Sequence, residues 1–152
     1  EHGYFKHSNA LYLYQENIHV PLIIYYPKAF SAKRVDEIVG IIDIYPTILD
    51  ILDIDIPSDI GGVSLLPLTT SKGVYDGDFA KSEIPSLPGS EEKQQTAIIS
   101  GDWKLIEVNK KSEEMPSLLF NLSLDPEEKK NLYDVSPVKR ESLKRYISDS
   151  SD

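Results

Sequence analysis

The sequence IVGIIDIYPTILDILD, residues 38–53, decides the fold class, because a short apolar run there leads into a capped amphipathic pattern. The run 38–42 predicts a short buried strand, of the kind found in a sheet covered on both faces. Asp43 is then a candidate N-cap, and Pro46 falls in the first helical turn, where its missing N–H costs nothing. Apolar residues recur every four positions and predict a helix over about 44–53. A strand followed by a capped helix is typical of an α/β fold.

An earlier run, VPLIIYY at residues 20–26, has the composition of a second buried strand. It is rich in β-branched and aromatic residues, and prolines bound it. Residues 69–95 have the least pattern and are rich in serine, glycine, proline and charge, so we expect a loop or linker there. The sequence thus predicts three regions, 1–68, 69–95 and 96–152, of which the first is α/β.

The last region predicts a small antiparallel sheet with one helix packed on it. Two apolar runs, 96–100 and 103–108, are separated by a Gly-Asp pair, which is a hairpin signal. Residues 118–122 are a third strand candidate, and Pro137 opens a final helix. One face of this helix is expected to hold Val138, Leu143, Tyr146 and Ile147.

The composition excludes several classes of site. The chain has 25 acidic and 16 basic side chains and a formal charge of −9. Such a surface repels phosphate backbones and anionic lipid, so we expect neither nucleic-acid nor membrane-surface binding. Without cysteine, the chain holds no disulfide framework, thiolate zinc site or cysteine nucleophile. The strongest apolar stretch, 35–56, is interrupted by acidic residues and proline, so we interpret it as core rather than a membrane span.

Four segments stand out when taken together and in their order: EHGYFKHSN (1–9), YQENIHVPLIIYYP (14–27), VGIIDIYPTILDILDIDIP followed by GVSLLPL (39–57 and 62–68), and SGDWKLIE with LFNLSLDPEEKKNLYD (100–107 and 119–134). These four segments resemble motifs of the sulfatase family in the alkaline-phosphatase-like superfamily. Short pieces such as VPLI or DPEE occur by chance, whereas four segments in the family's order are specific. The resemblance says nothing of the substrate.

The resemblance implies the C-terminal part of an alkaline-phosphatase-like sulfatase fold: residues 1–68 end the large α/β domain, and 96–152 form the small sheet with its helix. Sulfatases hydrolyse sulfate esters with a formylglycine, made from the cysteine or serine of a Cys/Ser-x-Pro-x-Arg motif, beside a calcium ion held by carboxylates. Neither that motif nor the upstream Asp-His-Gly metal element is in the sequence. We therefore expect formylglycine and calcium in the intact enzyme, and no metal ligands and no turnover in this fragment alone.

Lys6 and His7 are the candidate catalytic residues. The resemblance implies a lysine or histidine shortly after the EHG segment, where its positive charge meets a sulfate oxygen. Counting from Glu1 favours His7, whereas the following Ser8 and Asn9 favour Lys6, so the spacing leaves the choice open. We favour His7 as general acid or sulfate contact, because histidine titrates near neutral pH while lysine mainly supplies charge. Without the resemblance, the two would be an ordinary exposed polar pair.

Two other functions stay open. A phosphoesterase or phosphoglycerol transferase of the same superfamily would carry a threonine or serine nucleophile upstream, and a split or decayed gene would give a non-catalytic binding or interaction domain. In the sulfatase interpretation, the substrate is a small sulfate ester or a sulfated sugar, and family members are secreted, periplasmic or lysosomal by habit. We also expect the strand at 20–26, cut off from its sheet, to leave an apolar patch through which the fragment self-associates.

Overall fold

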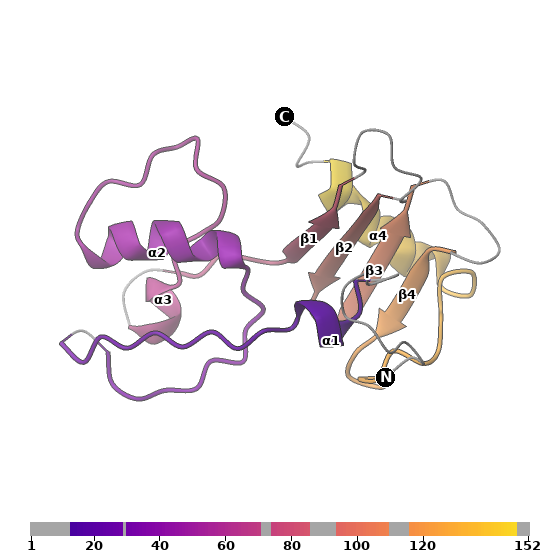
Figure 1. Cartoon of the computed structure of the whole chain (residues 1–152), viewed down its shortest axis with the longest axis horizontal. Helices are drawn as coiled ribbons and strands as arrows, with labels where there is room; N and C mark the ends of the chain where they lie inside the picture. Colours follow the sequence, from indigo (N-terminus) through magenta and orange to yellow (C-terminus); the bar gives the residue numbers. More distant parts are fainter. Residues whose placement is uncertain (1–12, 29, 71–73, 86–93, 110–115, 149–152) are drawn as a thin grey trace. The chain divides into compact units, whose positions relative to one another are not determined.

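The predicted hairpin of the second half forms the middle of a four-stranded sheet (Figure 1). The computed structural model describes residues 13–28, 30–70, 74–85, 94–109 and 116–148. The chain divides into two compact units. Unit 1 comprises residues 1–21 and 81–152, and unit 2 comprises residues 22–80.

The sheet, which lies in unit 1 apart from Ala80, has the strand order β1-β2-β3-β4. The strands are β1 Ala80–Ile84, β2 Gln95–Ser100, β3 Trp103–Val108 and β4 Leu118–Asn121. β2 pairs antiparallel with β3, and β3 pairs antiparallel with β4. Gly101 joins β2 to β3 at φ 54, the positive φ that a two-residue hairpin needs at its first central position. The three strands predicted in this half are confirmed, and β1 is an additional strand inside the stretch 69–95.

Alternation along the strands gives the sheet two buried faces. One face carries a core cluster of buried residues: Leu13, Ala97, Ile106, Val108, Leu118 and Phe120. Helix α4, Pro137–Ser148, covers the other face, contacts β2 and β3 and buries Leu143 (Figure 1). The predicted C-terminal helix is therefore confirmed, but Val138 is 85% exposed. Val138 precedes Leu143 by five positions, about 140° around the helix, and so lies on the opposite side.

The strands predicted at 20–26 and 38–42 are wrong. The described residues 22–70 contain no strand: residues 20–26 are irregular and exposed, and Ile41–Asp43 form the 3-10 helix η2. A strand needs a neighbour for its N–H and C=O groups, and within the described part of unit 2 no other strand lies beside these runs. High β-propensity alone is therefore not enough to make these runs strands.

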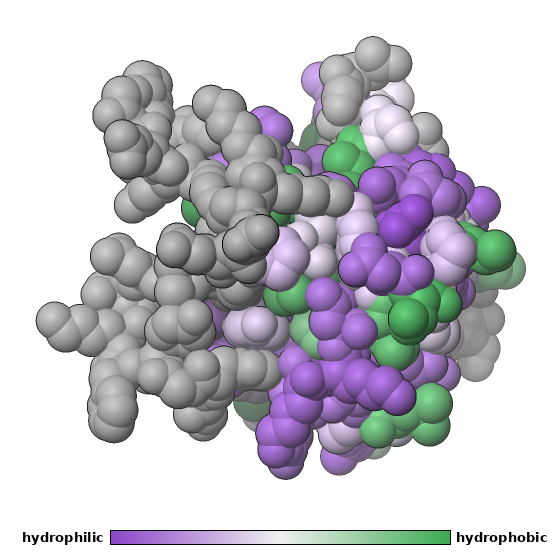
Figure 2. All heavy atoms as spheres, turned by 90° about the vertical axis from the view of Figure 1, so that its right-hand side faces the viewer, coloured by the Kyte–Doolittle hydropathy of each residue, from purple (hydrophilic) through white to green (hydrophobic). Residues whose placement is uncertain are grey.

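Large apolar side chains are exposed mainly in unit 2. Those of its described residues are Leu22, Ile23, Ile24, Tyr25, Tyr26, Ile41, Ile42, Tyr45, Ile48, Leu52, Ile54, Ile56 and Val74. The face of unit 1 seen in Figure 2 is instead mainly hydrophilic, with scattered apolar residues. Unit 2 thus carries most of the large apolar side chains that are exposed among the described residues.

The predicted helix after Asp43 is confirmed as α2, Ile44–Ile51, but the carboxylate of Asp43 does not cap it. Its Oδ2 accepts a hydrogen bond from the N–H of Gly40 at 2.7 Å, and its Oδ1 accepts one from Val63 at 2.9 Å. Asp43 already has helical φ and ψ, because η2 runs directly into α2, whereas a capping residue is extended. The aspartate therefore ties a distant loop to the start of α2.

A short helix, α3 at Leu66–Thr69, follows that loop. The hydroxyl of Thr47 accepts a hydrogen bond from the N–H of Leu65 at 2.9 Å and so holds the end of the loop against α2. Within the described ranges, none of the helices has the length and apolar character that a membrane crossing requires.

Gly62, in the same loop, is not expected to tolerate a side chain. Its φ is 84, and a Cβ there would lie 2.6 Å from the carbonyl oxygen of Ile42. We expect Gly62→Ala to destabilise unit 2 by about 2 kcal/mol and to speed hydrogen exchange in α2, because both the left-handed backbone and the contact are unfavourable. Gly101→Ala is the control, since Gly101 has a similar φ of 54 but no atom within 4 Å of the added Cβ. Equal losses for the two variants would contradict a role for the contact.

Candidate functional site

Lys6 and His7, the predicted site residues, lie outside the described residues. The first described residues that follow them, 13–19, contain the short helix α1, Gln15–Ile18. We call residues 13–19 the anchor segment, because hydrogen bonds and apolar contacts join it to the sheet of unit 1.

Apolar packing holds the anchor segment on one face of the sheet. Leu13 is buried in the core cluster, and Tyr14 and Ile18 pack against that cluster. The rings of Tyr14 and Phe120 lie 6.1 Å apart between centroids. The main-chain N–H of Leu13 also donates to Oε1 of the buried Gln95 at 3.3 Å. The start of the segment is therefore held by both packing and a buried hydrogen bond.

A buried ion pair contacts the next residue, Gln15. Nζ of Lys104 lies 2.7 Å from Oε1 of Glu128, and the two side chains are 0% and 2% exposed. Oε2 of Glu128 accepts a hydrogen bond from the main-chain N–H of Gln15 at 2.6 Å, and Lys104 donates to the Gln15 side-chain oxygen at 3.3 Å. The carboxylate thus satisfies one of the first N–H groups of α1, which lack partners within the helix. We call these three residues the Gln15–Lys104–Glu128 cluster.

Lys104 is buried because of its register in β3. It shares a face of the sheet with Ile106 and Val108, and its cross-strand neighbour is the buried Phe120. Burial lowers the pKa of Lys104 to about 8, and the charge and hydrogen bond of Glu128 oppose that shift. A lone ammonium in this position would be strongly unfavourable, so the lysine requires its glutamate.

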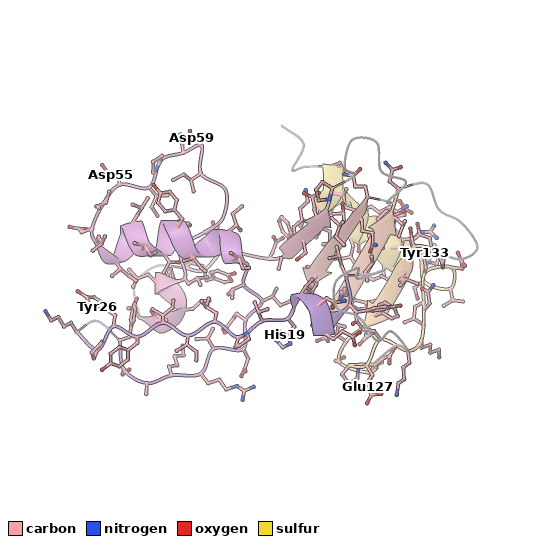
Figure 3. All side chains as sticks on the ribbon, viewed as in Figure 1. His19, Tyr26, Asp55, Asp59, Glu127 and Tyr133 are labelled. Atoms are coloured by element: carbon pink, nitrogen blue, oxygen red, sulfur yellow. The ribbon has the colours of Figure 1, made fainter. Side chains whose placement is uncertain are left out.

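The loop that carries Glu128 directs it inward. The carboxylate of Asp125 accepts hydrogen bonds from the N–H groups of Lys129 at 3.1 Å and Lys130 at 2.8 Å, which closes the loop. Glu128 has φ 53, a left-handed conformation that is uncommon for a residue with a side chain. The adjacent Glu127 is exposed, pairs with Lys129 and lies at the rim of unit 1 (Figure 3). Two neighbouring glutamates thus have opposite environments.

Sequence reasoning did not find this cluster, although β3 carries a signal for it. In WKLIEV, the lysine has the same strand parity as the isoleucine and the valine, so a buried face at Ile106 places Lys104 on that face too. A lysine on an apolar face implies a buried acid. The sequence does not say which of the 25 acidic residues supplies it.

Comparison with known proteins identifies the family. The family model described as N-sulphoglucosamine sulphohydrolase, C-terminal, matches residues 1–149. The chain belongs to the sulfatase family. It corresponds to the C-terminal portion of a sulfatase, and the fold class expected from the resemblance is confirmed.

Sulfatases similar to this chain are several times longer. Arylsulfatase K of Rattus norvegicus is 32% identical over 140 residues, which are 89% of this chain and 25% of that protein. The N-acetylglucosamine-6-O-sulfatase of Bacteroides thetaiotaomicron is 31% identical over 140 residues, 88% of this chain and 24% of that protein. BT4656, solved in complex with its substrate D-glucosamine-2-N,6-O-disulfate, matches with TM-score 0.58 and 25% identity over 71% of this chain and 23% of that one. The chain spans about a quarter of the length of these relatives.

On the opposite face of the sheet, this sulfatase portion has a second polar group around Tyr133, because Glu107 alternates with Lys104 along β3. Tyr133 is labelled in Figure 3. The Tyr133 hydroxyl donates to Glu107 at 2.9 Å, and Nζ of Lys144 lies 3.7 Å from the same carboxylate oxygen. The Arg140 guanidinium lies 4.8 Å from the centre of the Tyr133 ring and donates to the Tyr133 carbonyl at 3.1 Å. These charges are paired with one another, so we interpret the group as the polar contacts that hold α4 against the sheet.

The lowered pKa of Lys104 predicts how stability changes with pH. The ordinary lysine pKa is 10.5, and the folded value is about 8. Between these values the unfolded chain binds more protons than the folded chain, so the contribution of Lys104 to the free energy of unfolding rises with pH across this window. Urea unfolding across this pH window measures the free energy of unfolding of the unaltered chain and of Lys104→Met. The difference between the two free energies should rise with pH. A difference that stays constant would contradict a buried amine with a lowered pKa.

Proposed function

We propose that this chain is the C-terminal part of a sulfatase that hydrolyses sulfate esters of sugars. The observation that carries the proposal is the family match over residues 1–149. Further support comes from the Gln15–Lys104–Glu128 cluster, because its members belong to three of the resembling stretches, YQEN, WKLI and DPEE. The fold therefore brings into contact three resembling stretches that lie far apart in the sequence.

In this proposal the nucleophile and calcium belong to the upstream part of the intact enzyme. The chain has no cysteine and no serine in the formylglycine pattern. In the ranges that the structure describes, no three His, Asp or Glu side chains gather as metal ligands would. Residues 1–68 would complete the large α/β domain, 69–95 would connect it, and 96–152 would form the C-terminal subdomain.

The proposed contribution of the chain to the reaction comes from Lys6 and His7. His7, in its protonated form, would donate a proton to the leaving-group oxygen as the sulfur–oxygen bond breaks. Lys6 would place a positive charge near the sulfate oxygens and stabilise the negative charge that they carry. If the alignment is instead shifted by one residue, Lys6 takes the contact and supplies charge alone.

The substrate class that we propose is a sulfated glucosamine. One similar protein is named N-acetylglucosamine-6-O-sulfatase, and another was solved with D-glucosamine-2-N,6-O-disulfate as its substrate. Arylsulfatase K is similar over nearly the same share of the chain, and its name makes an aryl sulfate the alternative substrate.

A sulfatase assay with added calcium tests the proposal. The proteins are this chain alone and the longest open reading frame that contains it, with formylglycine verified by mass spectrometry. The substrates are glucosamine 6-sulfate, a generic aryl sulfate and the matching phosphate esters. We expect turnover by the longer protein alone, with the sugar sulfate preferred. Turnover by the 152 residues alone would contradict the upstream nucleophile, and faster phosphate hydrolysis would favour a phosphoesterase.

We also propose that the upstream part covers the exposed apolar side chains of unit 2, around 22–26 and 41–56. The chain alone should then self-associate, because such a surface is unfavourable in water. Analytical ultracentrifugation over a range of concentrations measures this association. Replacing Ile23 and Tyr25, which are 86% and 87% exposed, with serine should weaken it. A monomer at all concentrations would contradict the prediction.

A further inference from the structure

We propose that Asn121 is a site of N-linked glycosylation. It belongs to Asn121-Leu122-Ser123, the only stretch of the 152 residues that has the acceptor sequence Asn-x-Ser/Thr. Such short sequences arise by chance, so the place of this one in the fold and the bonds of its side chains decide whether it can be used. The modification would be independent of sulfate ester hydrolysis, because Asn121 has no part in that reaction.

The acceptor sequence lies where the edge strand of the sheet ends. β4 is an edge strand whose last residue is Asn121, and residues 122–124 form a turn (Figure 1). The strand predicted over 118–122 therefore ends one residue early. Ser123 is exposed, and Leu124 is 84% exposed. A glycan on Asn121 would thus extend from the rim of the sheet, where no strand pairing has to break to make room for it.

Local hydrogen bonds fix the orientation of the Asn121 amide. Its Oδ1 accepts the main-chain N–H of Leu124 at 3.2 Å and the hydroxyl of Ser123 at 2.8 Å. A main-chain N–H can only donate, so the amide atom that it meets is the carbonyl oxygen and Nδ2 points elsewhere. Within the described part of the chain, Nδ2 has no hydrogen-bond partner and is not buried. The nitrogen that would carry the glycan is therefore available.

The same hydrogen bonds favour the chemistry of glycan transfer. An amide nitrogen is a poor nucleophile, because its lone pair is delocalised into the carbonyl group. Two donors on Oδ1 stabilise negative charge on that oxygen, and this makes an N–H of the amide easier to deprotonate.

The transfer itself needs an oligosaccharide carried on a lipid pyrophosphate, and a transferase that binds both partners. Nδ2 of Asn121 forms a bond to the anomeric carbon of the oligosaccharide. The bond from that carbon to the pyrophosphate oxygen breaks, and the lipid pyrophosphate leaves with the bonding electron pair. A base of the transferase takes one proton from Nδ2.

The acceptor geometry does not depend on the folded sheet. The hydrogen bonds from Ser123 and Leu124 to the Asn121 amide join residues only two and three positions apart. Side-chain contacts of this local kind form without tertiary structure. A chain that has not yet paired β3 with β4 can therefore present the same turn to a transferase as the folded protein does.

Secretion from a eukaryotic host tests the proposal. The longest open reading frame that contains the chain is expressed behind a signal peptide. Its tryptic peptide 112–129, in which Asn121 is the only asparagine, is analysed by mass spectrometry from both cells and medium. We expect this peptide to carry a glycan, which peptide N-glycosidase F removes while leaving an aspartate in place of Asn121. Asn109→Gln changes an exposed asparagine outside the acceptor sequence and should keep the glycan.

Two substitutions at Ser123 show whether its hydroxyl is required. Ser123→Ala removes the hydroxyl and should abolish the modification, whereas Ser123→Thr keeps a hydroxyl and should retain it. An unmodified peptide 112–129, from cells in which a reference glycoprotein is glycosylated, would overturn the proposal. A glycan that persists in Ser123→Ala would overturn it too. A protein that is glycosylated but does not hydrolyse sulfate esters would contradict the proposed function alone.

Discussion

Lys104→Met is expected to lower the free energy of unfolding by about 3 kcal/mol or more. The substitution fills a similar volume, but it leaves the Glu128 carboxylate, which is 2% exposed, without its cationic partner. An uncompensated buried charge is among the most destabilising features of a protein interior. Urea unfolding at neutral pH, followed by the fluorescence of Trp103 in β3, measures the loss in unit 1.

The double variant Lys104→Met/Glu128→Gln distinguishes the unpaired charge from lost packing. It removes both charges and keeps a side-chain oxygen that can accept the N–H of Gln15. We therefore expect it to be more stable than Lys104→Met alone, although it contains one substitution more. Glu127→Gln removes an exposed charge from the same loop and should change little. A double variant as unstable as the single one would show that Lys104 acts by packing alone.

His7→Ala is expected to lower kcat by about 100-fold or more in a longer reading frame that is active, as the loss of a general acid does. Lys6→Ala should have the smaller effect if His7 meets the leaving group. The pH dependence of kcat provides a second readout, because the unaltered enzyme should lose activity as the imidazole loses its proton, and His7→Ala should not show that decline. If Lys6→Ala is instead the more damaging variant, Lys6 makes the contact with the sulfate and His7 is not the general acid.

The second half of the fold could be predicted because its signals are local. A Gly-Asp pair between two apolar runs is enough to predict the β2–β3 hairpin, and Pro137 marks the start of α4. The predicted strands 20–26 and 38–42 failed because a strand depends on a neighbour, and the sequence of the strand does not contain that neighbour. Asp43 failed as a cap for a related reason, since its carboxylate bonds to Val63, twenty positions away.

The sequence by itself determined the sulfatase family, through four segments in order, and named Lys6 and His7 as candidates by resemblance. The alternation of side chains along β3 also follows from the sequence, and it places Lys104 on the same face as Ile106. The tertiary structure alone decided that this face is covered and that Glu128, rather than its neighbour Glu127, pairs with the lysine. The reason is physical. Periodicity along a chain specifies which side chains share a face, but burial and pairing depend on contacts between residues far apart in sequence, such as Gln15 and Glu128, which are 113 positions apart.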